Sequence, residues 1–274
     1  MTLGLGILAA GKPFVTPPPG ELFNYKPLLC IGGHVTGTSC SSGFAITYPI
    51  VIMYVLTALI AWFFWRAFRA PKLVPTGSQN VAEVAVDFVR NQVTAPVLGT
   101  ESARWLPFLS TMFFWVLLLN VMEITPGVNF PITSIIAIPT MLALLSWIIF
   151  NAVGIKSQGF GGYLKGIMFP PGVPKPIVPL LALIEFFSTI IVRPITLAVR
   201  LFANMVAGHM ILSVLFLGCT VFLASGLGKI TFVLPFIFAI VMTGFELFVA
   251  AMQAFIITIL TAVYVAGALS EEGH

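Results

Sequence analysis

The feature that most constrains this chain is an uncharged stretch between Leu201 and Gly228, which contains no Asp, Glu, Lys or Arg. About 20 consecutive apolar residues suffice to span a bilayer as a helix. The whole chain has the same character, with 59% hydrophobic and 8% charged residues, whereas a soluble domain carries about 25% charged residues. We therefore expect an all-α polytopic membrane protein, since helices satisfy their backbone hydrogen bonds within lipid.

The polar side chains just before this stretch and in its first turns are unusual for a membrane segment. An arginine at the centre of a membrane helix costs roughly 3 kcal/mol on insertion scales, so it is usually kept for a function. At about 100° per residue, Arg193 and Arg200 fall within roughly 20° of each other, and Asn204 follows one turn after Arg200. His209 points to roughly the opposite side, about 13.5 Å further along the helix.

The run RPITLAVRLFANMVAGH, starting at Arg193, resembles the signature of the a subunit of F-type ATP synthases of the bacterial type. That pattern is K/R-P-x-[ST]-L-x-x-R-L-F-[GA]-N-[MI]-x-A-G, and each of its defined positions is met from Arg193 to Gly208. A second similar stretch, FELFVAAMQAFIITILTAVYV, covers Phe245 to Val265. The resemblance extends over about the last two thirds of the chain and is weak over the first 40 residues.

The resemblance implies a static, non-catalytic channel subunit of a rotary motor. Its implied partners are a rotor ring of small hairpin subunits, a peripheral-stalk subunit, the soluble catalytic ATPase head and the lipid bilayer. No cofactor or metal is implied. The coupling ion stays open between proton and sodium, because much of ion choice resides in the rotor.

The apolar runs predict about five membrane-embedded helices after an extracytoplasmic N-terminal segment, residues 1–43. A single channel domain, 44–274, follows. Its predicted spans are 44–64, 106–122, 131–154, 177–217 and 233–269. The last two are too long for upright spans, so they must be strongly tilted, bent or divided. Residues 78–94 show helical spacing of apolar positions and predict an interfacial amphipathic helix, with a soluble connecting helix as the alternative.

Basic residues set the predicted orientation. Aromatic and basic side chains follow the first span, at Trp62, Trp65, Arg66, Arg69 and Lys72. Three lysines without an acid follow the third span, at Lys156, Lys165 and Lys175. Both loops are therefore expected to be cytoplasmic, with the N-terminus outside, the C-terminus inside, and the chain in the inner (plasma) membrane.

The N-terminal segment is expected to be loop-like, because it contains TPPPG and several further glycines. Cys30 and Cys40 could form a disulfide on the extracytoplasmic side, and two free thiols are an equally weighted alternative.

Asn120 lies inside an apolar run and Glu123 three residues later, so both can share a helix face. The resemblance implies that an asparagine here and a nearby acid line the outer proton entrance. Each residue could instead belong to a solvated turn.

Glu246 and Gln253 are seven residues apart, and Tyr264 falls within about 20° of their side of the helix. The family often has an acid at the position of His209 and a histidine at that of Glu246. This exchange suggests a contacting pair, so we expect His209 and Glu246 to meet across the two long helices. A satisfied core histidine is the alternative for His209, and Tyr264 is better explained as an interface residue.

By the resemblance, Arg200 faces a rotor carboxylate and separates two aqueous half-channels. Glu185 is expected to line the cytoplasmic path, and Arg193 to be an interfacial anchor. The alternative is that Arg200 is a structural partner of Glu185.

Two other functions were weighed against the channel subunit. A stand-alone ion-coupled secondary transporter would show inverted repeats, and none is convincing here. A membrane enzyme of lipid metabolism would need a cluster of metal-binding residues. The basic residues cluster at the ends of apolar runs, which argues against binding to nucleic acid, and no GxxxxGK[ST] nucleotide motif occurs.

Overall fold

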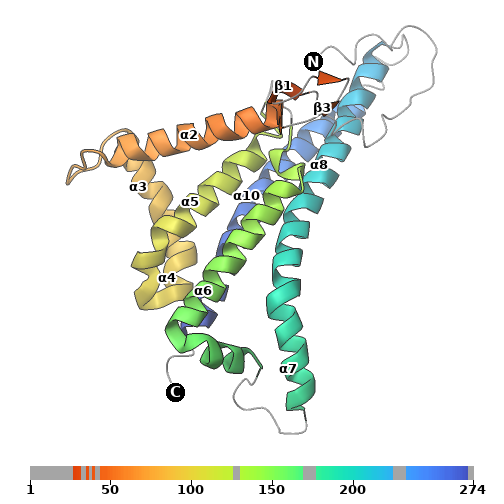
Figure 1. Cartoon of the computed structure of the whole chain (residues 1–274). Helices are drawn as coiled ribbons and strands as arrows, with labels where there is room; N and C mark the ends of the chain where they lie inside the picture. Colours follow the sequence, from red (N-terminus) through yellow and green to blue (C-terminus); the bar gives the residue numbers. More distant parts are fainter. Residues whose placement is uncertain are drawn as a thin grey trace.

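The computed structural model describes residues 27–31, 35–36, 39–40, 44–125, 130–168, 177–224 and 233–270. Long helices dominate this part of the chain, and short strands lie near its N-terminal end (Figure 1). Within it, five helical stretches are long and apolar enough to cross a membrane. The predicted all-α polytopic class is confirmed.

The strands form two small antiparallel pairs. β1 (Pro27–Ile31) pairs with β4 (Phe44–Thr47), and β2 (Val35–Thr36) pairs with β3 (Ser39–Cys40). The prediction of a loop-like segment over residues 1–43 is therefore wrong for β1, β2 and β3. Cys30 is disulfide-bonded, so the alternative of two free thiols is wrong. Cys219 is a buried free thiol, and the one other cysteine of the sequence is Cys40.

The first long helix, α2 (Tyr48–Phe68), begins later than predicted because Phe44–Thr47 is paired as β4. α2 extends away from the other helices (Figure 1), and most of its side chains are exposed. Its exposed aromatic residues include Trp62 and Trp65. An apolar helix with so little protein cover is suited to contact with lipid.

A continuous helical path runs from Ser78 to Val121. It comprises α3 (Ser78–Val89), a π-helical turn (Arg90–Thr94), α4 (Ala95–Leu98), a 3₁₀ turn (Gly99–Glu101) and α5 (Ser102–Val121). Ala82 and Val89 on α3 are buried, whereas Val81 and Val84 remain exposed. The predicted helix at 78–94 therefore exists, and its interfacial location stays a prediction.

The next helix, α6 (Ala137–Met168), follows a 3₁₀ turn at Ile132–Ser134. It was predicted to end at Gly154 but continues, and it breaks at Gly159, whose φ of 74° and ψ of 160° are not helical. Positive φ is readily adopted by glycine, which has no Cβ. Lys156 and Lys165 are therefore on helical segments rather than in a loop, and Lys175 lies outside the described residues.

The predicted span 177–217 is a continuous helical stretch of three parts, α7 (Val178–Phe187), a π-helical turn (Ser188–Val192) and α8 (Arg193–Ala224). The last helix, α10 (Val233–Ser270), has 38 residues and is about 57 Å long by rise. Both long helices are thus confirmed, and each exceeds the bilayer's hydrocarbon thickness of about 30 Å.

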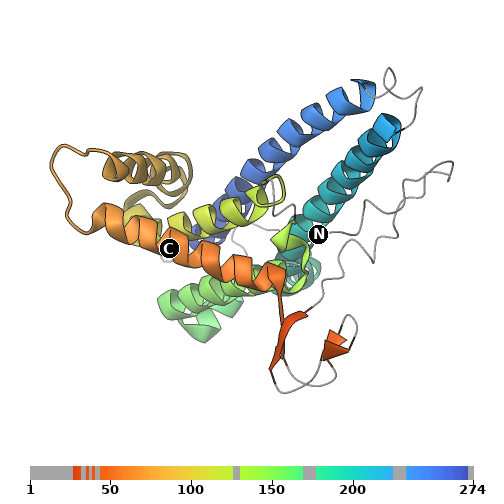
Figure 2. The same cartoon turned by 90° about the horizontal axis from the view of Figure 1, so that it is seen from above.

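The main core lies where α10 packs against α5, α6 and α8. Leu109, Val116, Leu201 and Ile257 are among its fully buried residues. Figure 2 shows α8 and α10 side by side, with the end of α8 and the start of α10 at the same end of the molecule. These two helices carry most of the candidate site residues.

Candidate functional site

Three titratable side chains from three elements meet beside α8. Glu123, just after α5, has its Oε1 atom 3.7 Å from Nδ1 of His209 on α8. The Glu123 side chain also interacts directly with that of Glu246 on α10. Glu123 and Glu246 are only 3% and 4% exposed. Glu123 therefore contacts both of the residues that were expected to meet. We call these three residues the outer cluster, after the side of the membrane on which the sequence predicts them.

The carboxyl oxygens of the outer cluster have few hydrogen-bond donors among the described residues. As carboxylates, Glu123 and Glu246 have no proton to donate to each other. Among the described residues, no hydrogen-bond donor reaches either oxygen of Glu123 or Oε1 of Glu246. A buried carboxylate without a donor is unfavourable. The arrangement is satisfied when a proton is shared between the carboxyl groups or when water enters.

Gly208 provides the space for one of these carboxyl groups. A Cβ atom at this position would overlap the carboxyl atoms of Glu246. Gly208 is buried on α8, directly before His209. The absence of a side chain therefore lets α8 and α10 approach each other at the outer cluster.

Asn120 braces the same region from α5 and is fully buried. Its Oδ1 accepts a hydrogen bond from the Thr133 hydroxyl at 2.9 Å, and its Nδ2 donates to the Ala250 carbonyl at 3.5 Å. Asn120 thus joins α5 to the 3₁₀ turn before α6 and to α10. Glu123 follows it by one turn, so this bracing holds the outer cluster in place.

The two long helices are also joined midway along their length. Asn204 on α8 donates a hydrogen bond from Nδ2 to Oε1 of Gln253 on α10 at 3.1 Å. Gln253 is 2% exposed. Arg200 lies one turn before Asn204 and is exposed. Within the described part of the chain Arg200 forms no ion pair, including none with Glu185.

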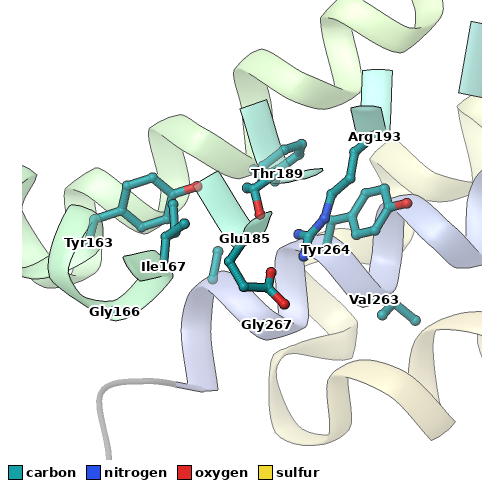
Figure 3. A pocket seen from close by; sticks show the side chains of 11 residues that line it. Tyr163, Gly166, Ile167, Glu185, Thr189, Arg193, Val263, Tyr264 and Gly267 are labelled. Atoms are coloured by element: carbon teal, nitrogen blue, oxygen red, sulfur yellow. The ribbon is translucent and has the colours of Figure 1, made fainter. Parts of the chain in front are cut away.

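A cavity of about 350 Å³ lies between α6, α7–α8 and α10. Its lining residues on α7–α8 precede Arg200 in the chain, and those on α10 lie near the C-terminal end of that helix. Glu185, Thr189 and Arg193 line it on one side, and Tyr264 lines it from α10 (Figure 3). The Arg193 guanidinium stacks over the Tyr264 ring at 4.9 Å from its centroid. We call this space the inner cavity, after the side of the membrane on which the sequence predicts Glu185. Tyr264 lines this cavity and contacts Arg193, and its location at the membrane interface stays a prediction.

Sequence comparison places this architecture in a family. The family model described as ATP synthase A chain matches residues 50–266. The chain belongs to the ATP synthase subunit a family. It is 45% identical to ATP synthase subunit a of Rhodococcus erythropolis over 277 residues, covering 100% of this chain and 96% of the relative. It is 47% identical to that of Frankia alni over 219 residues, covering 77% and 73%.

A further relative, ATP synthase subunit a of Streptomyces lividans, is 40% identical over 257 residues, 93% of this chain and 88% of the relative. The family resemblance predicted from the arginine-containing run is therefore confirmed. Membership of subunit a supports a multi-pass inner-membrane subunit with a role in proton translocation and ATP synthesis. It argues against both the stand-alone transporter and the lipid enzyme.

Two contributors to the site were not singled out from the sequence. Gly208 is part of the subunit a signature, so that motif could have identified it. Thr133 gave no local signal, because its role depends on the 3₁₀ turn that brings it to Asn120. The predicted direct contact of His209 with Glu246 stays a prediction, whereas each of these residues contacts Glu123.

Proposed function

We propose that this chain is the stator channel of a rotary ATP synthase, with two aqueous half-channels separated by Arg200. The observation that carries the proposal is the order of groups along α7–α8. The inner cavity with Glu185 comes first, exposed Arg200 follows, and the outer cluster around His209 comes last. Titratable or water-accessible groups thus occupy both ends, with an arginine between them.

Arg200 promotes the loss of a proton from a rotor carboxyl group and does not release its own proton, because a guanidinium stays protonated. A carboxylate at about 4 Å gains roughly 4 kcal/mol at an effective dielectric of about 20, which favours its ionised form by about three pKa units. A rotor carboxyl group approaching Arg200 therefore loses its proton into one half-channel. It must be reprotonated from the other before it re-enters lipid.

The outer cluster is the entrance in this proposal. Its carboxyl groups are satisfied by a shared proton, and the imidazole of His209 can both accept and donate a proton. Asn204 and Gln253 hold α8 against α10 between the cluster and Arg200. A proton that falls through 100 mV releases roughly 2.3 kcal/mol, which the rotor converts to torque.

The inner cavity is the exit, with Glu185 as its acidic lining and Arg193 held by Tyr264. The proposed partners are a rotor ring of carboxyl-bearing hairpins, which faces Arg200, together with a peripheral stalk and the soluble catalytic head. The proposed orientation has the N-terminus outside and the inner cavity and C-terminus facing the cytoplasm. Lysines at positions 156 and 165, close to the break in α6, support that orientation.

The test replaces Arg200 with Ala in the whole ATP synthase and uses inverted membrane vesicles. ATP-driven proton uptake and passive proton leak are measured together, with recovery of the assembled complex as the control. We expect pumping to be lost while assembly is retained, and the leak to increase. Retained pumping would mean that Arg200 is structural and that the proposal is wrong.

A further inference from the structure

The last part of α6 turns back on the helix that precedes it. Tyr163 lies 12 residues after Asn151, a separation of about 18 Å on a straight helix. The Tyr163 hydroxyl nevertheless donates to Oδ1 of Asn151 at 3.0 Å. The non-helical Gly159 makes this return possible, and Figure 1 shows the segment turning from the α6 axis toward α7. We call Phe160–Met168 the hook and the part of α6 before Gly159 the stem.

The stem is built to receive Tyr163. Asn151 donates from Nδ2 to the Trp147 carbonyl at 2.7 Å, which orients its Oδ1 for the tyrosine hydroxyl. Gly154 is buried under the Tyr163 ring, and a Cβ atom there would overlap the ring. Tyr163 itself is 8% exposed. Tyr163 therefore holds the hook to the stem in two ways, by packing of its ring on Gly154 and by the hydrogen bond of its hydroxyl to Asn151.

The stem is also attached to α10 just before the break. Ser157 and Gln158 both donate to the Ala268 carbonyl, at 3.1 Å and 3.2 Å. Ala268 lines the inner cavity. The hook therefore starts from a point that is already connected to another wall of that cavity.

The hook supplies the third wall of the inner cavity. Tyr163, Gly166 and Ile167 line it from the hook, opposite the side that carries Glu185 and Arg193 (Figure 3). The width and water content of the cavity therefore depend on where the hook lies. The phenol hydrogen is directed to Asn151, so Tyr163 can act on the cavity as a wall and an acceptor rather than as a proton donor.

We propose that Tyr163 is a positioning residue of the proton exit path, which locks the hook against the stem and so sets the wall of the inner cavity that faces Glu185 and Arg193. This proposal rests on the assignment of the inner cavity as the exit. It adds the hook, with Asn151 and Gly154 as its seat, to the parts that determine proton conductance.

The test uses the whole ATP synthase in inverted vesicles and measures the initial rate of ATP-driven proton uptake at equal amounts of assembled complex. Gly154→Ala displaces the ring, and Tyr163→Phe removes only the hydroxyl. The matched control is Gly161→Ala, a glycine on the hook whose added Cβ would meet nothing within 4 Å. We expect uptake to fall about fivefold with Gly154→Ala and about twofold with Tyr163→Phe, in line with one displaced contact or lost hydrogen bond, and not to change with Gly161→Ala.

A second readout separates positioning from general stability. A cysteine is introduced at Thr189, a buried residue that lines the cavity, and its alkylation by a membrane-impermeant maleimide is followed from the cytoplasmic face. The parent protein, with buried Cys219, gives the background. Displacement of the hook should raise the labelling rate of assembled complexes in the Gly154→Ala background and not in the Gly161→Ala background. A loss of stability alone would lower the amount of complex without this change in rate.

The outcomes distinguish this inference from the proposed function. Normal uptake with Gly154→Ala and Tyr163→Phe and unchanged labelling with Gly154→Ala, together with uptake impaired by Glu185→Gln, would overturn the role of Tyr163 and leave the exit assignment standing. Normal uptake in Glu185→Gln and Arg200→Ala as well would overturn both. If Gly154→Ala fails to assemble, Tyr163→Phe decides, because it keeps the ring in its seat.

Discussion

The outer cluster and the inner cavity place acidic groups at two ends of the same helix pair, yet they differ in their access to water. The cluster is enclosed, with Glu123 and Glu246 almost wholly buried and with few hydrogen-bond donors among the residues that the structure describes. The cavity is open, with a volume of about 350 Å³ around Glu185 and Arg193. In the proposed path, a proton therefore needs particular side chains at the cluster, whereas water can carry it through the cavity. Substitutions at the cluster should accordingly have the larger effects.

The largest effect is expected from Gly208→Val, which places a branched side chain where the Glu246 carboxyl lies. A displacement of about 1 Å at a reacting group can cost up to about 100-fold in rate, so we expect at least a tenfold loss of ATP-driven proton uptake. The control is Gly218→Ala on the same helix, where an added Cβ meets nothing within 4 Å. Normal pumping by Gly208→Val would show that the cluster is not a constrained part of the path.

A smaller effect is expected from Glu185→Gln in the inner cavity. Water can replace part of the lost relay, so proton uptake should fall about threefold rather than tenfold. The measurement is the same vesicle assay, made beside Gly208→Val at equal amounts of assembled complex. A loss as severe as that of Gly208→Val would break the distinction between an enclosed and an open end.

The hydrogen bond between Asn204 and Gln253, which lies between the outer cluster and the inner cavity, should contribute a small interaction energy. A double-mutant cycle with Asn204→Ala and Gln253→Ala should give an interaction energy of about 1 kcal/mol, as for one partly buried hydrogen bond. It is read from the thermal stability of the purified complex. Additive effects of the two substitutions would indicate that the 3.1 Å contact contributes no stability.

The smallest effect is expected at the ring under Arg193. Tyr264→Phe keeps the aromatic face and should change proton uptake less than about twofold, whereas Tyr264→Leu removes a cation–π contact of about 0.5–1 kcal/mol. We expect uptake with Tyr264→Leu to be about twofold to threefold lower. Equal rates for Phe and Leu would argue that Arg193 needs no aromatic support.

The sequence was sufficient for the parts that depend on local composition. Apolar length predicted the long helices, and the run from Arg193 to Gly208 indicated the family. The paired strand Phe44–Thr47 was missed because its apolar residues merge with those of the following helix. Its partner at Pro27–Ile31 lies in a segment with many prolines and glycines, where periodicity gives little information.

The candidate site was less predictable, because its geometry depends on contacts between elements. Glu123 was recognised as a candidate, but nothing local indicated that it contacts both His209 and Glu246. That position depends on where α5 ends and on the close approach of α8 and α10 at Gly208. Similarly, the lining of the inner cavity by Tyr264 depends on the position of Arg193, which follows a π-helical turn that helical periodicity does not anticipate.

That turn, Ser188–Val192, changes the rotational phase between α7 and α8. A π turn accommodates one residue more than an α turn, so the helix before it is rotated by about 100° relative to an uninterrupted α-helix. Removing one residue from this segment would restore a regular helix and turn Glu185 away from its present direction while leaving its sequence neighbours intact. The acid of the inner cavity thus owes its direction to a single surplus residue in the backbone.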